Sequence, residues 1–226
     1  MNDIPDLSKI KEKKMTLTNE KYEVAAMICE LAQLNPALIE SKSLEFIVEV
    51  DENIPEYLIG DKFLIKQILI NILSNAAKYT ESGSITLEVC TVDTVNPNIV
   101  DLIISVKDTG RGMTEEQLTS VFEAYKGFHE NDSAPITGTG PGMPIVKELL
   151  KLMDGEIDVT SQVDNGTTVT ILVPQQIYSS EKAAHCISDY EACKLEAELS
   201  AVLKTMLRIR SVLHNLSINR HTDSIG

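Results

Sequence analysis

The sequence predicts an α+β fold: a two-layer sandwich in which helices cover one face of a mixed, largely antiparallel sheet, plus a C-terminal helix. Three observations support this prediction. Helix-like and strand-like segments alternate along the chain. Residues 61–79 carry apolar side chains at helical spacing. Residues 85–89 alternate between apolar and polar types and 100–106 are almost all apolar, which predicts two neighbouring strands joined by a hairpin at 96–98.

The elements before this hairpin are predicted from local patterns. Met15 to Thr18 is typical of a short edge strand, and the apolar spacing after Lys21 predicts a helix over 22–40, which Pro36 should end or kink. A strand over 44–50 and a turn at 53–55 come next, followed by the long helix 61–79.

The elements after the hairpin follow the same logic. A short helix is expected at 114–121, and the next segment, up to Gly140, shows no periodicity. The remaining predicted elements are a helix over 144–153 and two strands, 156–162 and 167–173, linked through the turn 164–166.

Composition excludes several classes of protein. The chain has 226 residues, of which 43% are hydrophobic and 24% charged, as in soluble globular proteins. A net charge of -14 disfavours nucleic acid as a partner, so that an anionic ligand must be held locally. We find no apolar stretch long enough to span a membrane and no signal peptide, and we therefore expect a cytoplasmic protein without direct membrane contact. The four cysteines lack metal or disulfide spacing, and reduced thiols are expected.

Four segments are expected: residues 1–14, a main domain over 15–176, an amphipathic helix over 181–218 and a flexible tail over 219–226. The helix carries apolar residues in a 4-3 heptad pattern. Two alternatives remain for this helix: it packs back on its own domain, or its 195–216 seam mediates self-association or docking on another domain. The seam residues are Leu195, Leu199, Val202, Met206, Ile209, Leu213 and Leu216.

The polar face of helix 61–79 is the first candidate site. Asn71, Asn75 and Lys78 follow one another at intervals of about one turn, with Gln67 a turn earlier. Asparagine oxygens suit Mg²⁺ that arrives with phosphates, and a lysine one turn on can pair with the same phosphates. Taken alone, the pattern also fits a solvated polar face.

Two glycine-rich segments are the other candidates. Asp108 to Met113 follows an apolar strand; its glycines allow close approach of a ligand, and Asp108 can accept hydrogen bonds from an amino group such as that of adenine. Gly138 to Met143 precedes a helix, where backbone N–H groups can hold an anion. The aperiodic segment between the two could fold over a nucleotide as a lid. Each segment alone also fits an ordinary turn.

The order of these motifs resembles the catalytic, ATP-binding domain of bacterial sensor histidine kinases. Members of the same GHKL superfamily include gyrase, a DNA mismatch-repair ATPase and a heat-shock chaperone. The similarity covers roughly residues 15–175, and residues 5–14 resemble the end of the second helix of the dimerising, phosphoacceptor domain. The matching residues are Asn71, Asn75, Ala76, Lys78, Tyr79, Thr80, Asp108, Gly110, Gly112, Met113, Phe122, Gly138, Thr139, Gly140, Gly142, Met143, Gly166 and Thr167.

The resemblance implies a role for each motif. Asp108 would bind the adenine amino group, and Asn75 would chelate Mg²⁺ with help from Asn71. Lys78 and Tyr79 would contact the nucleotide, and Asn71, Asn75 and Lys78 form the implied catalytic set. Gly110 and Gly112 would line the base pocket, and Gly138, Gly140 and Gly142 would close the lid over the phosphates. The other residues of the implied ATP site are Met113, Lys126, Thr139, Met143 and Thr167.

The sequence departs from the family pattern at the lid and at the phosphoacceptor. Pro141 and Pro144 remove two N–H donors from the third glycine motif, and Lys126 is the only Lys or Arg between Phe122 and Lys147. These differences predict weak closure over ATP. None of His129, His185, His214 and His221 lies in a phosphoacceptor context before the domain. The chain alone is therefore not expected to phosphorylate itself.

Two functions remain open on the sequence. The first is an ATP-binding kinase domain that presents the γ-phosphate to a histidine on a separate dimerisation domain, with a response regulator downstream. The alternative is a degenerate ATP-gated interaction module, or an ATPase of the same superfamily. Hydrolysing members place a glutamate one turn before the Mg²⁺-binding asparagine, whereas this chain has Asn71, and an amide cannot act as a general base.

Overall fold

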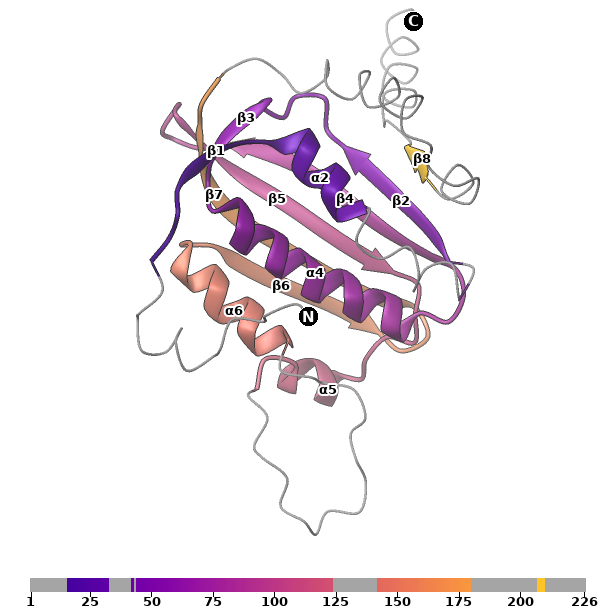
Figure 1. Ribbon diagram of the computed structural model, residues 1–226. Coiled ribbons are helices and arrows are strands. Elements are labelled where there is room, and N and C mark those ends of the chain that lie inside the picture. Colours follow the sequence, from indigo (N-terminus) through magenta and orange to yellow (C-terminus); the bar gives the residue numbers. More distant parts are fainter. Residues whose placement is uncertain (1–15, 33–41, 43, 124–141, 180–206, 210–226) are drawn as a thin grey trace, which may run out of the picture.

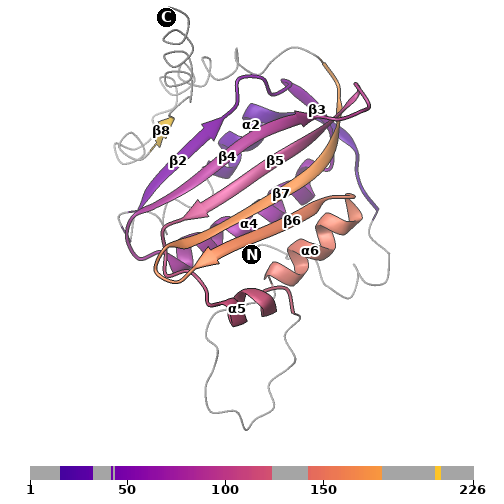
Figure 2. The ribbon, with the colours of Figure 1, turned by 180° about the vertical axis from the view of Figure 1, so that it is seen from behind.

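The computed structural model describes residues 16–32, 42, 44–123, 142–179 and 207–209. Within them, helices α2 (Val24–Ala32), α4 (Lys62–Tyr79) and α6 (Gly142–Leu152) lie on one face of a single sheet, and the short α5 (Glu115–Ser120) lies at one end (Figure 1). Seen from behind, the other face of the sheet carries none of these helices (Figure 2). The predicted two-layer α+β sandwich is confirmed.

The sheet is mixed and mostly antiparallel. Its order is β1-β3-β7-β5-β4-β2-β8, and β6 also pairs with β7. Only β2 runs parallel to its neighbours, β4 and β8. The strands are β1 (Glu20–Glu23), β2 (Glu45–Val50), β3 (Tyr57–Gly60), β4 (Ser84–Asp93), β5 (Ile99–Asp108), β6 (Glu156–Gln162), β7 (Gly166–Ile177) and β8 (Leu207–Ile209).

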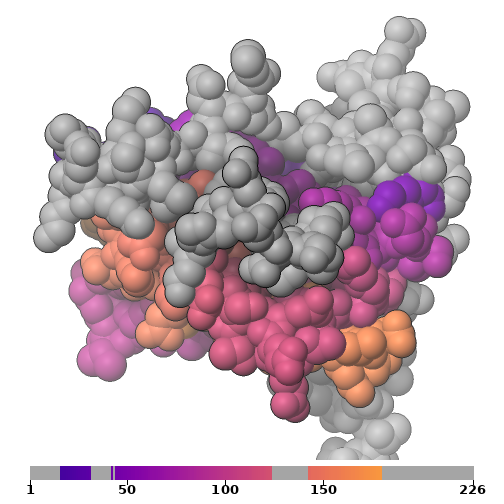
Figure 3. Space-filling view, turned by 90° about the horizontal axis from the view of Figure 1, so that it is seen from below, coloured from indigo at the N-terminus to yellow at the C-terminus, as the bar shows by residue number. Residues whose placement is uncertain are grey.

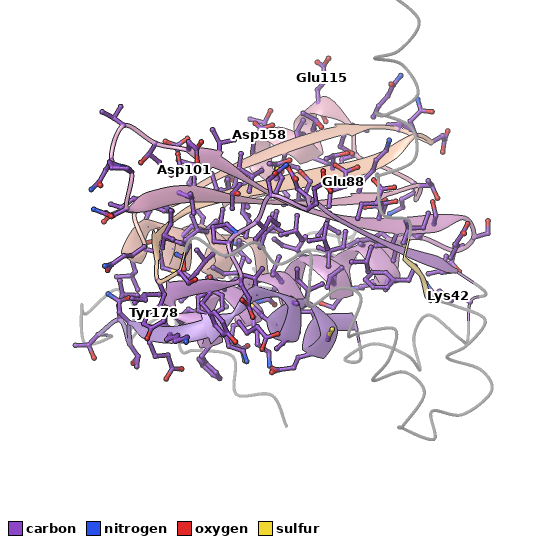
Figure 4. All side chains as sticks on the ribbon, turned by 90° about the horizontal axis from the view of Figure 1, so that it is seen from above. Lys42, Glu88, Asp101, Glu115, Asp158 and Tyr178 are labelled. Atoms are coloured by element: carbon purple, nitrogen blue, oxygen red, sulfur yellow. The ribbon has the colours of Figure 1, made fainter. Side chains whose placement is uncertain are left out.

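Alternation along the central strands separates the core from the open face. In β5, Val100, Leu102, Ile104 and Val106 are each at most 2% exposed, because they face the helices. Acidic side chains, including Glu88, Asp101 and Asp158, project from the opposite face (Figure 4). Helix α4 buries an apolar stripe against the sheet. The stripe consists of Leu64, Ile65, Ile68, Leu69, Ile72, Leu73, Ala76 and Ala77.

Two predictions at the start of the domain are wrong. A strand was predicted at 15–18, but residues 16–18, the part of it that the structure describes, are not in a strand. The predicted helix 22–40 begins two residues late, at Val24, because Glu20–Glu23 form β1. The contacts of Tyr22 explain why this segment is a strand. Tyr22 pairs with Leu58 of β3, and its buried hydroxyl donates to Gln175 Oε1 at 2.9 Å. Sheet pairing therefore overrides the helical pattern. Residues 33–41 of the predicted helix lie outside the described residues.

β3 and β8 were not expected from the sequence. β3 has only four residues, too few for a period to be recognised, and it joins β1 to the end of β7. Residues 207–209 form β8 against β2, so this part of the predicted helix 181–218 is wrong. The rest of that helix, the segment 1–14 and the tail 219–226 lie outside the described residues. No helix within the described ranges is both long and apolar enough to cross a membrane.

The corner where β1, β3 and β7 meet depends on a glycine. Gln175 is 3% exposed, and its side chain packs over Gly60, where an added Cβ would lie 2.0 Å from Gln175 Oε1. The same oxygen accepts the hydrogen bond from Tyr22. Lys21 supports this corner from outside, since its ammonium lies 3.8 Å from the centre of the Tyr57 ring and 4.0 Å from that of Tyr178.

We expect Gly60→Ala to destabilise the domain by about 1–3 kcal/mol, because the methyl group must displace the buried Gln175 side chain and break its bond to Tyr22. Urea unfolding measures the change. In Gly60→Ala/Gln175→Ala the clash is absent, so the two substitutions together should destabilise less than the sum of the singles. Strict additivity, or an unchanged midpoint for Gly60→Ala, would contradict this account of the corner.

Candidate nucleotide-binding site

Helix α4 is fixed at both ends. At its start, Asp61 accepts from Leu64 N at 3.0 Å through Oδ1 and from Thr18 N at 2.9 Å through Oδ2. At its end, the fully buried Thr80 donates through its hydroxyl to Ala76 O at 2.7 Å. The apolar stripe faces the sheet, and the predicted residues Asn71, Asn75, Lys78 and Tyr79 therefore occupy other sides of the helix.

The two asparagines face the start of α6. Asn71 Nδ2 donates to Gln67 O at 3.2 Å, which orients the carboxamide. An added Cβ on Gly142 would lie 3.4 Å from Asn71 Oδ1 and 3.8 Å from Asn75 Nδ2. The structure thus brings together the first predicted motif and the described part of the third. α6 begins at Gly142, two residues before the predicted start, so Pro144 falls in its first turn, where a missing N–H is tolerated.

The residues present fit Mg²⁺ only as a partner of phosphates. Neither Asn71 Oδ1 nor the Asn75 carboxamide has a hydrogen-bond partner among the described residues, so both can act as neutral oxygen ligands. Across the same part of the chain there is no cluster of three or more His, Cys, Asp or Glu side chains that could hold a metal ion. Neutral amides alone bind Mg²⁺ weakly, whereas they suit a cation whose charge is already balanced by a bound polyphosphate.

Asp108 lies at the end of β5 and is 7% exposed. Its Oδ1 accepts from Gly110 N at 2.9 Å and from Thr167 N at 3.3 Å. Burial raises the pKa of this carboxyl, and the two backbone N–H groups and the Thr80 side chain partly oppose that rise by favouring the ionised form. The result is a buried hydrogen-bond acceptor that is positioned by the loop after β5 and by the start of β7.

The glycines after Asp108 allow the loop to pass close to other backbone. A Cβ on Gly110 would lie 2.4 Å from Tyr79 O, and one on Gly112, at a φ of 64°, would lie 1.9 Å from Gln162 O. Arg111 N donates to Tyr79 O at 3.3 Å. The loop is thereby held between the end of α4 and the β6–β7 turn.

Ser161 connects Met113 to Thr167. Its Oγ accepts from Met113 N at 2.9 Å and lies 2.9 Å from Thr167 Oγ1. Sequence reasoning missed Ser161, since a serine in a polar strand gives no signal of its own. Figure 3 shows the face of the molecule on which α5 and the β6–β7 turn lie, next to the loop that follows Asp108.

Tyr79 is the other feature of the site. Its hydroxyl is buried and lacks a hydrogen-bond partner within the described ranges. Lys78 Nζ lies 5.1 Å and the Arg111 guanidinium 4.6 Å from the centre of the Tyr79 ring. Arg111 was not predicted, although its place between two glycines of the motif is a signal. The predicted residues Lys126, Gly138, Thr139 and Gly140 lie outside the described residues.

These contacts define an α+β nucleotide-binding domain in which an amide-bearing helix meets a buried carboxylate. Residues 60–177, more than half of the chain, match the model of the histidine kinase-, DNA gyrase B- and HSP90-like ATPase family. The chain belongs to this family, as a catalytic ATP-binding domain of the kind found in two-component histidine kinases.

Similar curated proteins carry sensor-kinase names. The chain is 33% identical over 174 residues to hybrid signal transduction histidine kinase L of Dictyostelium discoideum, covering 76% of this chain and 10% of that protein. It is 31% identical over 174 residues to the aerobic respiration control sensor protein ArcB of Escherichia coli K12, covering 76% of this chain and 22% of that protein. The chain therefore spans less than a quarter of the length of these relatives.

Solved structures share the fold. Full-length ShkA in complex with AMPPNP aligns with a TM-score of 0.64 at 22% identity, covering 78% of this chain and 35% of that one. The mycobacterial sensor histidine kinase MprB aligns with a TM-score of 0.51 at 25% identity, covering 71% of this chain and 99% of that one.

We expect Asp108→Asn to weaken nucleotide binding by about 1.5–3 kcal/mol, as for a hydrogen bond to a charged group, while the fold is retained. Isothermal titration with an ATP analogue measures the affinity, and unchanged affinity would refute the adenine role.

The same variant should be at least as stable as the unsubstituted chain at neutral pH. Because the folded-state pKa of Asp108 is raised, the folded protein binds the proton more tightly than the unfolded chain, and stability is lost as pH rises through that window. Asparagine does not titrate. The free energy of unfolding of Asp108→Asn, relative to the unsubstituted chain, should therefore increase with pH from the ordinary carboxyl range upward. An opposite pH trend in urea unfolding would show that burial is not the dominant effect on this carboxyl.

Proposed function

We propose that this domain binds ATP with Mg²⁺ and presents the γ-phosphate to a histidine on a separate dimerisation domain, with a response regulator as the later acceptor. Asp108 would hold the adenine amino group, and Asn71 and Asn75 would hold the metal, which neutralises phosphate charge when bound. Lys78 and Tyr79 would contact the nucleotide. Because ATP is supplied in the cytoplasm, we expect such a domain to work there.

One observation favours phosphotransfer over hydrolysis. The α4 side chains that lie nearest to Gly142, at the start of α6, are the amides of Asn71 and Asn75, and Asn71 stands where hydrolysing members of the superfamily have a glutamate. An amide cannot remove a proton from water at neutral pH, so this side of the site supplies no nucleophile of its own. Phosphoryl transfer depends mainly on positioning and charge, and it still requires a nucleophile delivered in line. In this proposal a histidine nitrogen of the other domain attacks the γ-phosphorus, and ADP leaves.

We expect Asn75→Ala to abolish the Mg²⁺-dependent part of ATP binding and any phosphotransfer, while metal-free nucleotide binding survives. Titrations with and without Mg²⁺ separate the two parts. Asn98→Ala, in the exposed β4–β5 hairpin, is the matched control and should behave as the unsubstituted chain. If the Asn75 variant loses affinity equally with and without Mg²⁺, the assignment to the metal is wrong.

The isolated chain should bind ATP without labelling itself and without appreciable hydrolysis, because it has neither a carboxylate base on α4 nor a phosphoacceptor histidine before residue 15. Adding a dimerisation domain that bears the histidine should restore labelling of that domain in trans. Radiolabelled ATP tests both expectations, and Asp108→Asn, which should bind nucleotide more weakly, should label the added domain less than the unsubstituted chain does.

The other outcomes distinguish the alternatives. Rapid phosphate release from the isolated chain would favour an ATPase. Strong label on the chain itself would show that one of its own histidines is an acceptor. ATP binding without any transfer in trans would favour a nucleotide-gated interaction module.

A further inference from the structure

Lys42, which comes three residues before β2 begins at Glu45, contacts the C-terminal end of α4. Its Nζ donates to Ala77 O at 3.1 Å, Lys78 O at 3.0 Å and Thr80 O at 3.3 Å, and it lies 3.3 Å from Glu81 Oε1. The Lys42 side chain is 21% exposed, against 85% for Glu81. Figure 4 shows Lys42 at the end of the molecule where α4 ends.

These bonds account for the carbonyl groups that a helix leaves without partners at its C-terminus. Ala76 O is taken by Thr80 N, and Tyr79 O accepts from Arg111 N. Lys42 takes the remaining two, Ala77 O and Lys78 O, and Thr80 O beyond them. An ammonium group has three donors, and its charge also interacts favourably with the negative end of the helix dipole.

The turn that Lys42 holds also carries the nucleotide-contacting residues. Lys78 and Tyr79 are its last helical residues. Thr80 connects it to the adenine side of the site, since a Cβ on Gly110 would lie 2.9 Å from both Thr80 Oγ1 and Asp108 Oδ1. A shift of this turn would therefore move Lys78 and Tyr79 relative to Asp108.

We infer that Lys42 is a positioning residue of the nucleotide site: by binding the last carbonyls of α4, it fixes Lys78 and Tyr79 relative to Asp108. This inference rests on the proposed function, because it assigns to Lys42 the alignment of the same site. The other ion pairs of the described residues have no such link: Lys62 and Lys66 contact Glu30, and Lys151 contacts Glu148 at 2.8 Å on α6.

The test compares Lys42→Met, which keeps the apolar stem and removes the donors, with Lys151→Met, which removes the same charge elsewhere. Affinity for ADP and for a non-hydrolysable ATP analogue with Mg²⁺ is measured by calorimetry, and urea unfolding gives the fraction folded. We expect about tenfold weaker binding for Lys42→Met, since a charged, partly buried helix cap is lost. Lys151→Met and Glu81→Gln should bind as the unsubstituted chain does.

Two further measurements separate positioning from simple loss of charge or of fold. A positioning effect persists at high ionic strength, whereas long-range attraction of the nucleotide is screened. Lys42→Arg keeps the charge, but its planar fork cannot direct three donors from one atom, so we expect an intermediate loss of about threefold. If Lys42→Met does not fold, the arginine variant decides the question.

The outcomes are distinguishable. Nucleotide binding by the unsubstituted chain, with full affinity in the folded Lys42→Met and Lys42→Arg variants, would overturn the inference and leave the proposed function standing. Failure of the unsubstituted chain to bind nucleotide would overturn the proposed function, and with it the inference. Loss of affinity that disappears at high ionic strength would assign Lys42 to electrostatic attraction and would also overturn its positioning role.

Discussion

The packing of α4 against the sheet is the constraint on which the rest of the structure depends. Eight buried side chains of this helix fix its rotation, since turning it would expose them to water. Once the rotation is fixed, Asn71 and Asn75 face the start of α6. The length of the helix is set equally firmly, by Asp61 at its start and by Thr80 at its end. The same core that stabilises the domain thereby determines which side chains reach the site.

The burial of Asp108, the proposed adenine-binding residue, costs stability. Burial disfavours the ionised Asp108, although that form is the better acceptor. The backbone offsets part of this cost through Gly110 N and Thr167 N, which lie on two different segments. These two donors can reach one oxygen because Gly166, at a φ of 91°, lets β7 begin against the backbone of Asp108. Gly110 and Gly166 therefore contribute to the electrostatic environment of Asp108 as well as to the course of the backbone around it.

Much of the fold was predictable, because α4 and the β4–β5 hairpin have strong, long periodic patterns. β1 and β3 were not, since Tyr22 becomes a strand residue only through its partners Leu58 and Gln175, which are distant in sequence. In the candidate site, the order of the motifs singled out Asn71, Asn75 and Asp108, and the structure shows where these side chains lie. The order of the motifs did not identify Lys42, whose role depends on main-chain carbonyls that carry no residue-specific signal. Side-chain motifs are visible in a sequence, whereas contacts to backbone become visible only in a structure.

The distribution of charge explains how a chain with a net charge of -14 can hold an anionic ligand. Acidic side chains such as Glu88, Asp101 and Asp158 project from the open face of the sheet, away from the helices (Figure 4). Cations gather instead around the end of α4, where Lys78 and Arg111 flank Tyr79 and Lys42 lies behind them on the carbonyls. Within a Debye length of about 8–10 Å, such a local group outweighs more distant charges. In the proposed function, this group of cations favours the negatively charged nucleotide, and the acidity of the remaining surface acts mainly against the approach of larger polyanions.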